Sequence, residues 1–226
     1  MIIITAGPSF EPLDNVRRIT NMSTGRLGTE LAQYLVDNTE DEVCLLRGSM
    51  ASYPCSMPNS PQFHKYDFDT PNDLLKLFRQ NATEKPCTIF HAAAVNDFGF
   101  GKIFEKDRNG TLREIPESTK YATHGNVSSY FVELRPTVKI LPQLRALFPQ
   151  ATIVGWKYET EGNQADLLAK VEYQIEKCKT DFCILNGPAF EQGFGTKYVI
   201  ISKNRSRINC SNMDLLFKSI LLHILK

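Results

Sequence analysis

Apolar and polar residues follow two different periods along this chain of 226 residues. Short apolar runs have the length and composition of buried strands, and they cover residues 2–5, 42–46, 87–92, 151–156 and 181–186. The stretches between these runs have apolar residues at helical spacing, and they cover residues 25–37, 71–82, 137–148 and 164–179. Because strands and helices alternate, we predict a Rossmann-like α/β fold in three layers, with a mostly parallel central sheet and helices on both faces.

The C-terminal part continues this pattern. KYVIIS at 197–202 predicts a late strand and is a candidate for the sheet edge. MDLLFKSILLHILK, from Met213 onward, predicts a closing helix, with Asn212 as its N-cap. In the helix predicted at 164–179, we expect one stripe to face the core, formed by Leu168, Val171, Ile175 and Cys178.

Two segments have no clear period. Residues 48–62, GSMASYPCSMPNSPQ, contain several prolines and serines and predict a surface loop. Residues 98–129 are rich in Gly, Ser, Thr and charged side chains, and long segments of this kind are typically lids, binding loops or disordered. We expect a mobile active-site loop there. The sequence contains no recognisable repeat or linker, so we predict a single domain over residues 1–226.

Composition narrows the range of partners. The 26 Lys and Arg side chains balance 25 Asp and Glu side chains, so no net field attracts nucleic acid, and a small-molecule partner is favoured. The first residues, MIIIT, lack the basic region of a signal peptide, and no apolar run approaches the ~18 residues of a membrane span. We therefore expect a cytoplasmic protein. The 6 cysteines are scattered, mostly within apolar runs, which indicates buried thiols.

The stretch NMSTGRLG, Asn21 to Gly28, lies on the loop and first turn between the first predicted strand and the first predicted helix. Its glycines have two interpretations. They make a tight turn in which Ser23 or Thr24 caps the helix, or they let backbone N–H groups approach an anion at the positive end of the helix dipole. The second interpretation predicts a phosphate site.

Three further features favour a ligand at this position. TAGPSFEP, residues 5–12, is a small-residue turn after the first strand, at the carboxyl end where open α/β sheets bind ligands. Arg17, Arg18 and Asn21 supply hydrogen-bond donors upstream of the same helix. HAAAVNDF, residues 91–98, ends a central strand with small residues that leave room for a ligand, and a carboxylate follows them.

These segments resemble the signature of the phosphopantothenoylcysteine synthetases, the phosphopantothenate:cysteine ligases of coenzyme A biosynthesis. The resemblance spans nearly the whole chain, and the matching blocks follow the family's order: ITAGPSFEPLDNVRRITNMSTGRLG at 4–28, HAAAVNDF at 91–98, LRPTVKIL at 134–141, VGWKYET at 154–160 and DFCILN at 181–186. The flavin-dependent decarboxylase domain that is fused to many bacterial members has no counterpart in this sequence. The resemblance therefore implies a stand-alone synthetase that uses no flavin.

The resemblance also implies a reaction. Family members join 4'-phosphopantothenate to cysteine and form 4'-phospho-N-pantothenoylcysteine. The pantothenate carboxylate attacks the α-phosphate of CTP or ATP and expels pyrophosphate, and the amine of cysteine then displaces the nucleotide from the acyl-nucleotidyl intermediate. This chemistry needs an anion cradle, a cation that offsets the phosphate charge, and donors that hold the acyl group. We therefore expect Mg²⁺ as cofactor, with CTP favoured as co-substrate.

Individual residues gain roles by the same resemblance. The catalytic roles fall on Asn21, which matches the residue that holds the acyl intermediate, and on Lys102, which matches the lysine that closes over the phosphates. After Lys102 the chain continues with IFEK, whereas bacterial members commonly have Ile-Lys-Lys, so this segment carries less positive charge. The nucleotide-binding positions match Gly7, Ser23, Gly25, Gly28, Trp156 and Asn186.

The remaining matches concern the other substrates. Substrate-binding positions match Arg17, Ala93, Ala94 and Asp97, and Asp97 is also the candidate magnesium ligand. In the family the arginine equivalent to Arg17 reaches the ligand of the neighbouring subunit, so the resemblance implies a homodimer. Asn96 departs from the family, which usually has a small residue there, and Gly-Pro after Asn186 is also unusual.

Two alternatives stay open. An NAD(P)-dependent Rossmann oxidoreductase would need G-x-G-x-x-G after the first strand and an acidic residue at the end of the second. The sequence has AGPSFEP and Arg47 at these places. A non-catalytic nucleotide-binding relative is suggested by the altered KIFEK segment, and turnover would separate it from the ligase.

Overall fold

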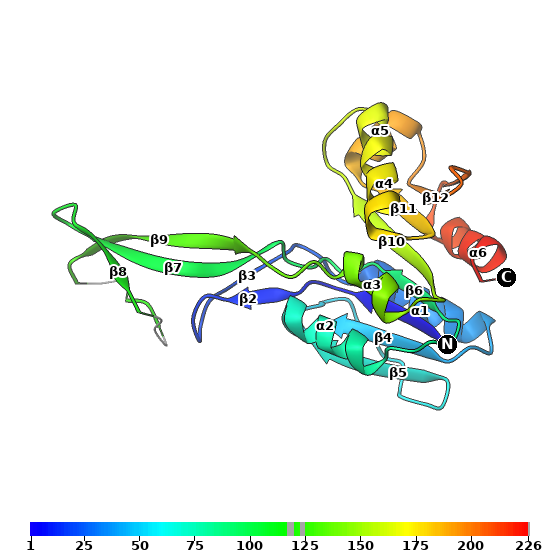
Figure 1. Ribbon diagram of the computed structural model, residues 1–226, viewed down its shortest axis with the longest axis horizontal. Coiled ribbons are helices and arrows are strands. Elements are labelled where there is room, and N and C mark those ends of the chain that lie inside the picture. Colours follow the sequence, from blue (N-terminus) through cyan, green and yellow to red (C-terminus); the bar gives the residue numbers. More distant parts are fainter. Residues whose placement is uncertain (117–119, 123–124, 226) are drawn as a thin grey trace.

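The computed structural model describes residues 1–116, 120–122 and 125–225. In these residues the main sheet has the order β13-β12-β11-β10-β6-β1-β4-β5 (Figure 1). Its strands are β1 (Ile2–Ala6), β4 (Val43–Gly48), β5 (Phe63–Phe68), β6 (Thr88–His91), β10 (Thr152–Tyr158), β11 (Phe182–Asn186), β12 (Tyr198–Ser202) and β13 (Arg207–Cys210). Across this sheet, the neighbouring strands β5, β4, β1, β6, β10 and β11 all run parallel. β12 is antiparallel to β11, and β13 is antiparallel to β12, so the prediction of a mostly parallel sheet is confirmed.

Helices cover both faces of this sheet, as predicted. α1 (Arg26–Asn38) and α6 (Met213–His223) pack on one face, in a cluster that includes Leu35 and Ile220. α2 (Pro71–Gln80) and α3 (Leu141–Leu147) pack on the other face, and α4 (Gln164–Cys178) and α5 (Pro188–Phe194) pack beside β11 and β12. Strands that are buried on both faces have continuous apolar sequences, and each predicted apolar run corresponds to one such strand.

The ends of the helices follow local chemistry. Thr70 and Asp73 form a capping box at the start of α2, and Asn163 and Asn212 accept hydrogen bonds from the first-turn amides of α4 and α6. The prediction for Asn212 is therefore confirmed. The helix predicted at 137–148 was too long, because α3 begins only at Leu141. Lys226, the last residue of the predicted closing helix, lies outside the described residues.

Two details of the C-terminal half differ from the prediction. In α4 the fully buried stripe runs through Leu167, Val171 and Gln174, while Leu168 and Ile175 are only partly buried. KYVIIS forms β12 but does not form the sheet edge, because β13 pairs with its outer side. The chain turns between these two strands at Arg205, whose φ of 64° is the left-handed conformation of a tight turn.

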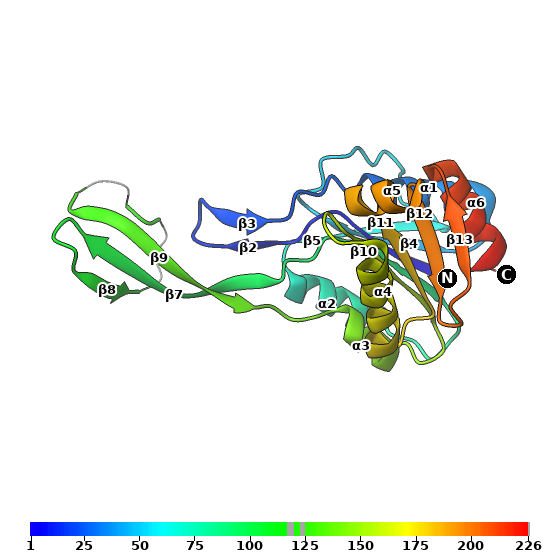
Figure 2. The same ribbon diagram turned by 90° about the horizontal axis from the view of Figure 1, so that it is seen from above.

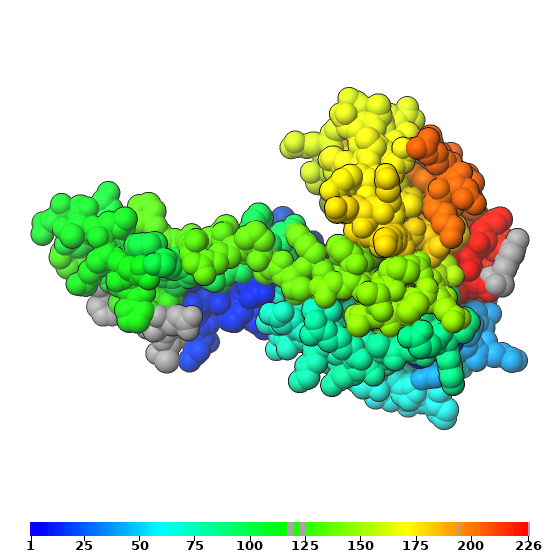
Figure 3. All heavy atoms as spheres, in the orientation of Figure 1, coloured from blue at the N-terminus to red at the C-terminus, as the bar shows by residue number. Residues whose placement is uncertain are grey.

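The segment expected as a loop at 98–129 is largely sheet. β7 (Phe98–Asp107), β8 (Leu112–Ile115) and β9 (Val127–Pro136) form an antiparallel three-stranded sheet that we call the arm. The arm projects from the body beside the hairpin of β2 (Phe10–Pro12) and β3 (Arg18–Thr20), as Figures 1 and 3 show. Most of its residues are exposed or half-exposed, so its sequence lacks the alternation that burial on one face produces. Residues 117–119 and 123–124 of this segment lie outside the described residues, and its mobility stays a prediction.

Residues 49–62 contain neither helix nor strand, so the predicted surface loop is confirmed. This loop contacts the body of the protein, because Cys55 and Met57 pack against the hydrophobic cluster between α1 and the sheet. The strand after it, β5, escaped the sequence analysis because its central residues, His64 to Asp67, are polar or half-exposed. Among the described residues, no helix is both long and apolar enough to cross a membrane.

Candidate functional site

The loops that follow the parallel strands gather at the carboxyl edge of the main sheet (Figure 2). After β1 and β6 they are joined directly. Ala94 N donates to Gly7 O at 3.0 Å and Ser9 N donates to Ala94 O at 3.2 Å, so Pro8 and Ala94 form a parallel bridge. The fold therefore brings Gly7, Ala93 and Ala94, which the sequence analysis singled out, into one place.

Three predicted glycines lie where the chain has no room for a side chain. Gly7 and Gly25 have positive φ angles of 81° and 77°, and a Cβ on them would lie 2.6 Å and 2.9 Å from the Cβ of Ala51. A Cβ on Gly28 would lie 2.7 Å from the Cβ of Ala6. Glycine is thus required at all three positions by backbone conformation or packing. The result is a close approach between the loop after β1 and the first turn of α1.

The start of α1 differs from the starts of α2, α4 and α6. Gly25 is its N-cap, and within residues 1–116 no side chain caps the helix and no acidic residue lies in its first turn. Gly25 N and Arg26 N donate only long hydrogen bonds, of 3.4 Å to Ser23 Oγ and 3.3 Å to Thr24 Oγ1. Of the two interpretations of this motif, the one in which Ser23 or Thr24 caps the helix is not observed, because Gly25 is the N-cap. An uncapped helix start presents free N–H groups and the positive end of the helix dipole, which suits an anion.

Asn21 connects this helix start to the loop after β6. Its Nδ2 atom donates to Ala94 O and Val95 O, both at 3.1 Å, and the residue is exposed. These two hydrogen bonds fix the orientation of the amide group, and its Oδ1 atom is an acceptor. The structure therefore brings Asn21 together with Ala94, at the same edge as the glycines.

Asn96 and its neighbours hold the loop after β6 in place. Asn96 is buried, its Nδ2 donates to Ile19 O at 2.9 Å, and its backbone N donates to Ser9 Oγ at 2.8 Å. Its backbone O accepts from the hydroxyl of Thr137. Among the described residues its Oδ1 atom has no partner. Asn96, the departure noted in the sequence, thus ties the β2–β3 hairpin to the site.

Asp97 is exposed at the end of this loop and forms an ion pair with Lys139. Sequence reasoning assigned no role to Lys139 or Thr137, although both lie in the family block LRPTVKIL. That block was the available signal. Over the described residues, no three His, Cys, Asp or Glu side chains converge on a metal position, so a magnesium ion at Asp97 would need oxygen ligands from a substrate.

Trp156 and Asn186 reach the same edge from β10 and β11. Trp156 is half-buried against the cluster that includes α1, and it pairs in register with Ile184. Asn186 ends β11, and its Oδ1 atom is buried with no partner in the described part of the chain. The following Gly187 has a φ of 118°, and a Cβ there would lie 2.4 Å from Glu159 O, which explains the unusual glycine.

Arg17 and Lys102 lie on the two elements that project from the body (Figure 1). Arg17, between β2 and β3, donates to Asp14 Oδ2 at 2.5 Å and 3.0 Å and to Tyr121 O at 2.9 Å. The two hydrogen bonds from Arg17 to Asp14 hold the pKa of the Asp14 carboxyl well below its usual value. Lys102, on β7, pairs with Glu114 Oε2 at 2.7 Å. Their contacts within one chain thus lie on the hairpin and the arm, apart from the glycines.

His91 is a structural group at this edge. Burial lowers its pKa to about 4, so the ring is neutral at physiological pH. Thr5 Oγ1 accepts from Ala93 N at 2.9 Å and shares a hydrogen bond of 3.0 Å with His91 Nδ1. His91 thereby supports the loop that carries Ala93.

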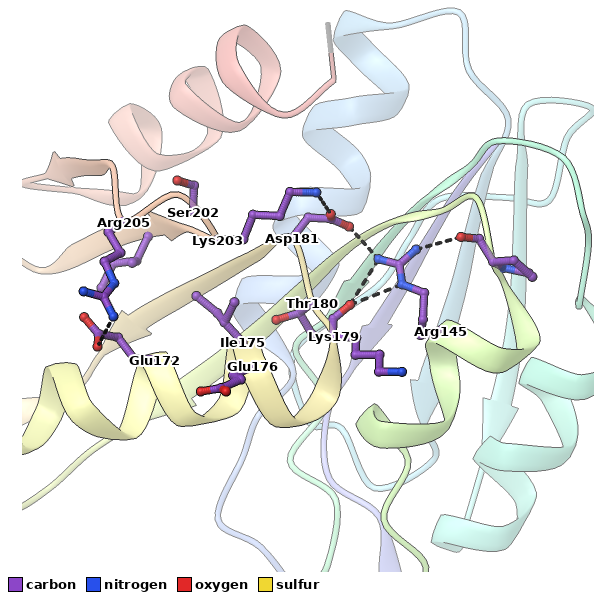
Figure 4. Close-up of a pocket in the computed structure, with 12 residues that line it drawn as sticks. Arg145, Glu172, Ile175, Glu176, Lys179, Thr180, Asp181, Ser202, Lys203 and Arg205 are labelled. Atoms are coloured by element: carbon purple, nitrogen blue, oxygen red, sulfur yellow. Dashed lines mark hydrogen bonds and ion pairs between the residues drawn. The ribbon is translucent and has the colours of Figure 1, made fainter.

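The opposite, amino edge of the sheet contains a hollow of about 620 Å³. Figure 4 shows Arg145 beside Asp181 and the end of α4, with dashed lines from its guanidinium group to both. Arg145 donates to Asp181 Oδ2 at 2.7 Å and to Lys179 O at 3.1 Å, and Asp181 also pairs with Lys203 at 2.9 Å. These charges satisfy one another, and none of the predicted site residues lines the hollow.

An open, mostly parallel sheet with helices on both faces and loops gathered at its carboxyl edge defines a Rossmann-like α/β protein. Within this class, the chain belongs to the family described as the DNA/pantothenate metabolism flavoprotein C-terminal domain, whose model matches residues 1–219. The family predicted from the sequence motifs is thereby confirmed.

Two relatives are bifunctional coenzyme A biosynthesis proteins called CoaBC. The protein of Thermococcus kodakarensis is 27% identical over 187 residues, which cover 82% of this chain and 40% of that protein. The protein of Vibrio vulnificus is 32% identical over 197 residues, which cover 86% of this chain and 43% of that protein. This chain thus spans about two-fifths of the length of these relatives.

Solved structures share the fold. The DNA/pantothenate metabolism flavoprotein of Streptococcus pneumoniae superposes with a TM-score of 0.75 and 20% identity, over 98% of each chain. A Cab2 mutant in complex with phosphopantothenate-cysteine superposes with a TM-score of 0.64 and 19% identity, over 100% of this chain and 88% of that one. At these identities the likeness establishes the fold.

Proposed function

We propose that this chain is a phosphopantothenate:cysteine ligase that uses CTP or ATP, forms an acyl-nucleotidyl intermediate and releases pyrophosphate. The observation that carries the proposal is the uncapped start of α1, which lies at the carboxyl edge beside Asn21 and the loop of Ala93 and Ala94. Family membership supports it, because relatives are named for coenzyme A biosynthesis. We also propose a cytoplasmic location, as expected for such an enzyme.

In this proposal the polyphosphate lies on the backbone amides at the start of α1, where the helix dipole offsets its charge. Ser23 adds a hydroxyl beside these amides. Trp156 and Asn186 approach the nucleotide from β10 and β11, and the partnerless Oδ1 of Asn186 is an acceptor for a base or ribose donor. The pantothenate carboxylate lies next to Asn21 and Ala94, within reach of the α-phosphate.

Magnesium fits this arrangement as a companion of the triphosphate. Mg²⁺ in such sites keeps several waters and binds one or two carboxylates together with phosphate oxygens. Asp97 supplies one exposed carboxylate at the end of the loop after β6, and the bound ion would offset phosphate charge.

A pyrophosphate assay tests the proposal. The protein is mixed with 4'-phosphopantothenate, cysteine and Mg²⁺, and CTP and ATP are compared in parallel. We expect pyrophosphate release that depends on phosphopantothenate, with one nucleotide preferred. Nucleotide binding without release would instead identify a non-catalytic relative, and binding of NAD(P) alone would identify the oxidoreductase alternative.

We further propose a homodimer in which Arg17 serves the site of the neighbouring subunit. Exposed apolar side chains of the hairpin and arm support an interface there, namely Val16, Ile19, Phe98, Leu112, Phe131 and Leu134. Mixing two impaired variants, Arg17→Ala and Asn21→Ala, and letting the subunits exchange should restore activity, because a heterodimer contains one intact site. An active monomer in sedimentation, or no recovery despite subunit exchange, would contradict the shared site.

A further inference from the structure

Residues 48–53, which we call the strap, cross the carboxyl edge between the end of β4 and the start of α1. The methyl group of Ala51 on the strap lies against both Gly7 and Gly25, since it is the nearest group to a Cβ built on either glycine. Tyr53 N donates to Thr24 O at 3.0 Å, one residue before Gly25. The strap therefore joins the two backbone segments that form the proposed polyphosphate cradle.

Arg47 holds the strap from below. It occupies the end of β4, in register with Ala6 of β1. Its Nη2 atom donates to Ala51 O at 2.8 Å and to Tyr53 O at 2.5 Å. One guanidinium group thus fixes the residue that packs on the glycines and the residue that bonds to Thr24. Hydrogen bonds from a charged donor are among the stronger ones in proteins.

The outer side of the strap is anchored to α1. Tyr53 donates its hydroxyl hydrogen to Glu30 Oε1 at 2.6 Å, and Arg26 Nε donates to the same atom at 2.7 Å. The guanidinium carbon of Arg26 lies 5.7 Å from the centroid of the Tyr53 ring. The strap is therefore fixed at Arg47, Thr24 and Glu30, and Ala51 lies between these anchors.

We propose that Arg47 is a positioning residue for the nucleotide polyphosphate. By holding Ala51 between Gly7 and Gly25, it sets the separation between the loop after β1 and the first turn of α1. Backbone donors must be placed within about 0.5 Å to bind phosphate well, so loosening the strap weakens nucleotide binding without removing any group that touches the nucleotide. This inference rests on the proposed function, because it assumes that the cradle binds a nucleoside triphosphate.

Arg145 provides a matched control. It also donates to backbone carbonyls, at 2.7 Å to Ala151 O and 3.0 Å to Pro149 O, but at the opposite edge of the sheet. We therefore compare Arg47→Met with Arg145→Met in the full chain. The measurements are calorimetric Kd values for CTP and ATP with Mg²⁺, the KM values for nucleotide and phosphopantothenate, kcat, and the melting temperature.

For Arg47→Met we expect a rise of about tenfold in the nucleotide Kd and KM, with a much smaller change in the KM for phosphopantothenate. A tenfold rise in Kd corresponds to the free energy of about one charge-assisted hydrogen bond. Arg145→Met should lower the melting temperature and leave the nucleotide Kd within about twofold, since its described hydrogen bonds are made at the amino edge. Arg47→Lys, which retains a donor for one carbonyl, should recover part of the nucleotide affinity.

The outcomes separate the inference from the proposed function. If the unchanged protein neither binds a triphosphate nor releases pyrophosphate, both fail. If it does both and Arg47→Met leaves the nucleotide Kd unchanged, or if the two methionine variants weaken binding equally, only the inference is overturned. Should Arg47→Met fail to fold, Ala51→Gly provides the test. We expect the nucleotide Kd to rise about threefold, because this variant removes the methyl group that packs against Gly7 and Gly25. An unchanged Kd would overturn the inference.

Discussion

The two edges of the main sheet treat their polar groups in opposite ways. At the amino edge, the guanidinium of Arg145 donates to three backbone carbonyls and to Asp181, and that carboxylate also accepts from Lys203 and from Ile153 N. At the carboxyl edge, buried side-chain oxygens of Asn96 and Asn186 have no partner within the described residues.

This difference separates stability from binding. A buried polar atom without a hydrogen bond costs about 1–3 kcal/mol, so a fold keeps such atoms mainly where a ligand or water completes them. The amino edge has only Thr180 Oγ1 in this condition among the described residues that line its hollow. We infer that the charges at the amino edge hold the fold together, while the carboxyl edge is left incomplete for a ligand. Four predictions test this contrast.

The largest effect is expected at Asn21. In Asn21→Ala the amide that lies between the helix start and the loop of Ala94 is lost, and the acyl intermediate should still form but react slowly with cysteine. Losing one positioned polar group of this kind typically lowers kcat by about 10²–10³-fold. Rapid-quench analysis should show the accumulated intermediate.

Asn38→Ala is the matched control for this variant. Asn38 Nδ2 also donates to a backbone carbonyl, Tyr34 O at 2.8 Å, but at the far end of α1. Its kcat should stay within about twofold of the unchanged protein. The role of Asn21 is refuted if its alanine variant makes no intermediate, or if the two variants are equally impaired.

The second prediction concerns the amino edge. Asp181→Asn removes the charge that Arg145 and Lys203 share, and it leaves the partly buried guanidinium of Arg145 without this anion. We expect a loss of about 2–3 kcal/mol in the free energy of unfolding, measured with urea, and an unchanged nucleotide Kd. If Asp181→Asn weakened nucleotide binding but not stability, the division between the two edges would be wrong.

Acid pH provides the third test. His91 is neutral in the folded protein because burial lowers its pKa from 6.5 to about 4. The unfolded chain therefore binds more protons between these values, so this residue's contribution to stability is present above pH 6.5 and is lost as the pH falls toward 4. The penalty should be on the order of 2 kcal/mol at pH 5.

Unfolding by urea at pH 7 and pH 5 measures this effect. The His91→Gln variant should lose less stability than the unchanged protein over this range, because glutamine cannot gain the proton. His64→Gln is the control, since His64 is only half-buried, beside Glu42, and this variant retains the buried His91. An identical pH dependence in all three proteins would show that His91 is not held neutral.

The sequence predicts those parts of the fold that burial specifies. β1, β4, β6, β10 and β11 are continuous apolar runs because both of their faces are covered, and each was found. The arm was missed because it has no buried face. Even its apolar residues, such as Phe131 and Leu134, are exposed, so apolar and polar residues do not alternate along its strands. The edge strand β13, with Cys210 as its one fully buried residue, was missed for the same reason.

At the site, the sequence identifies residues whose neighbours are close in the chain. The motif NMSTGRLG locates Gly25 and Gly28 because a helix start with glycine is a local pattern. The contacts of Ala51 with Gly7 and of Arg47 with Tyr53 leave no such pattern, because they depend on how a loop without regular structure folds over the edge. An alanine in such a loop carries no signal until the fold is known.

The smallest effect is expected at the exposed ion pair of Asp97 and Lys139, whose side chains are 67% and 57% exposed. Lys139→Ala should change the free energy of unfolding by less than about 1 kcal/mol, because solvent screens such pairs.

If Asp97 helps to bind magnesium, removing its competing cation should lower the Mg²⁺ concentration for half-maximal activity, by at most about fivefold for a pair of this strength. Lys170→Ala is a control, because it breaks another ion pair, between Lys170 of α4 and Glu159. A magnesium dependence that is the same in both variants would leave Asp97 as a partner of Lys139 alone, and the carboxyl edge would then have to bind the metal through the phosphates.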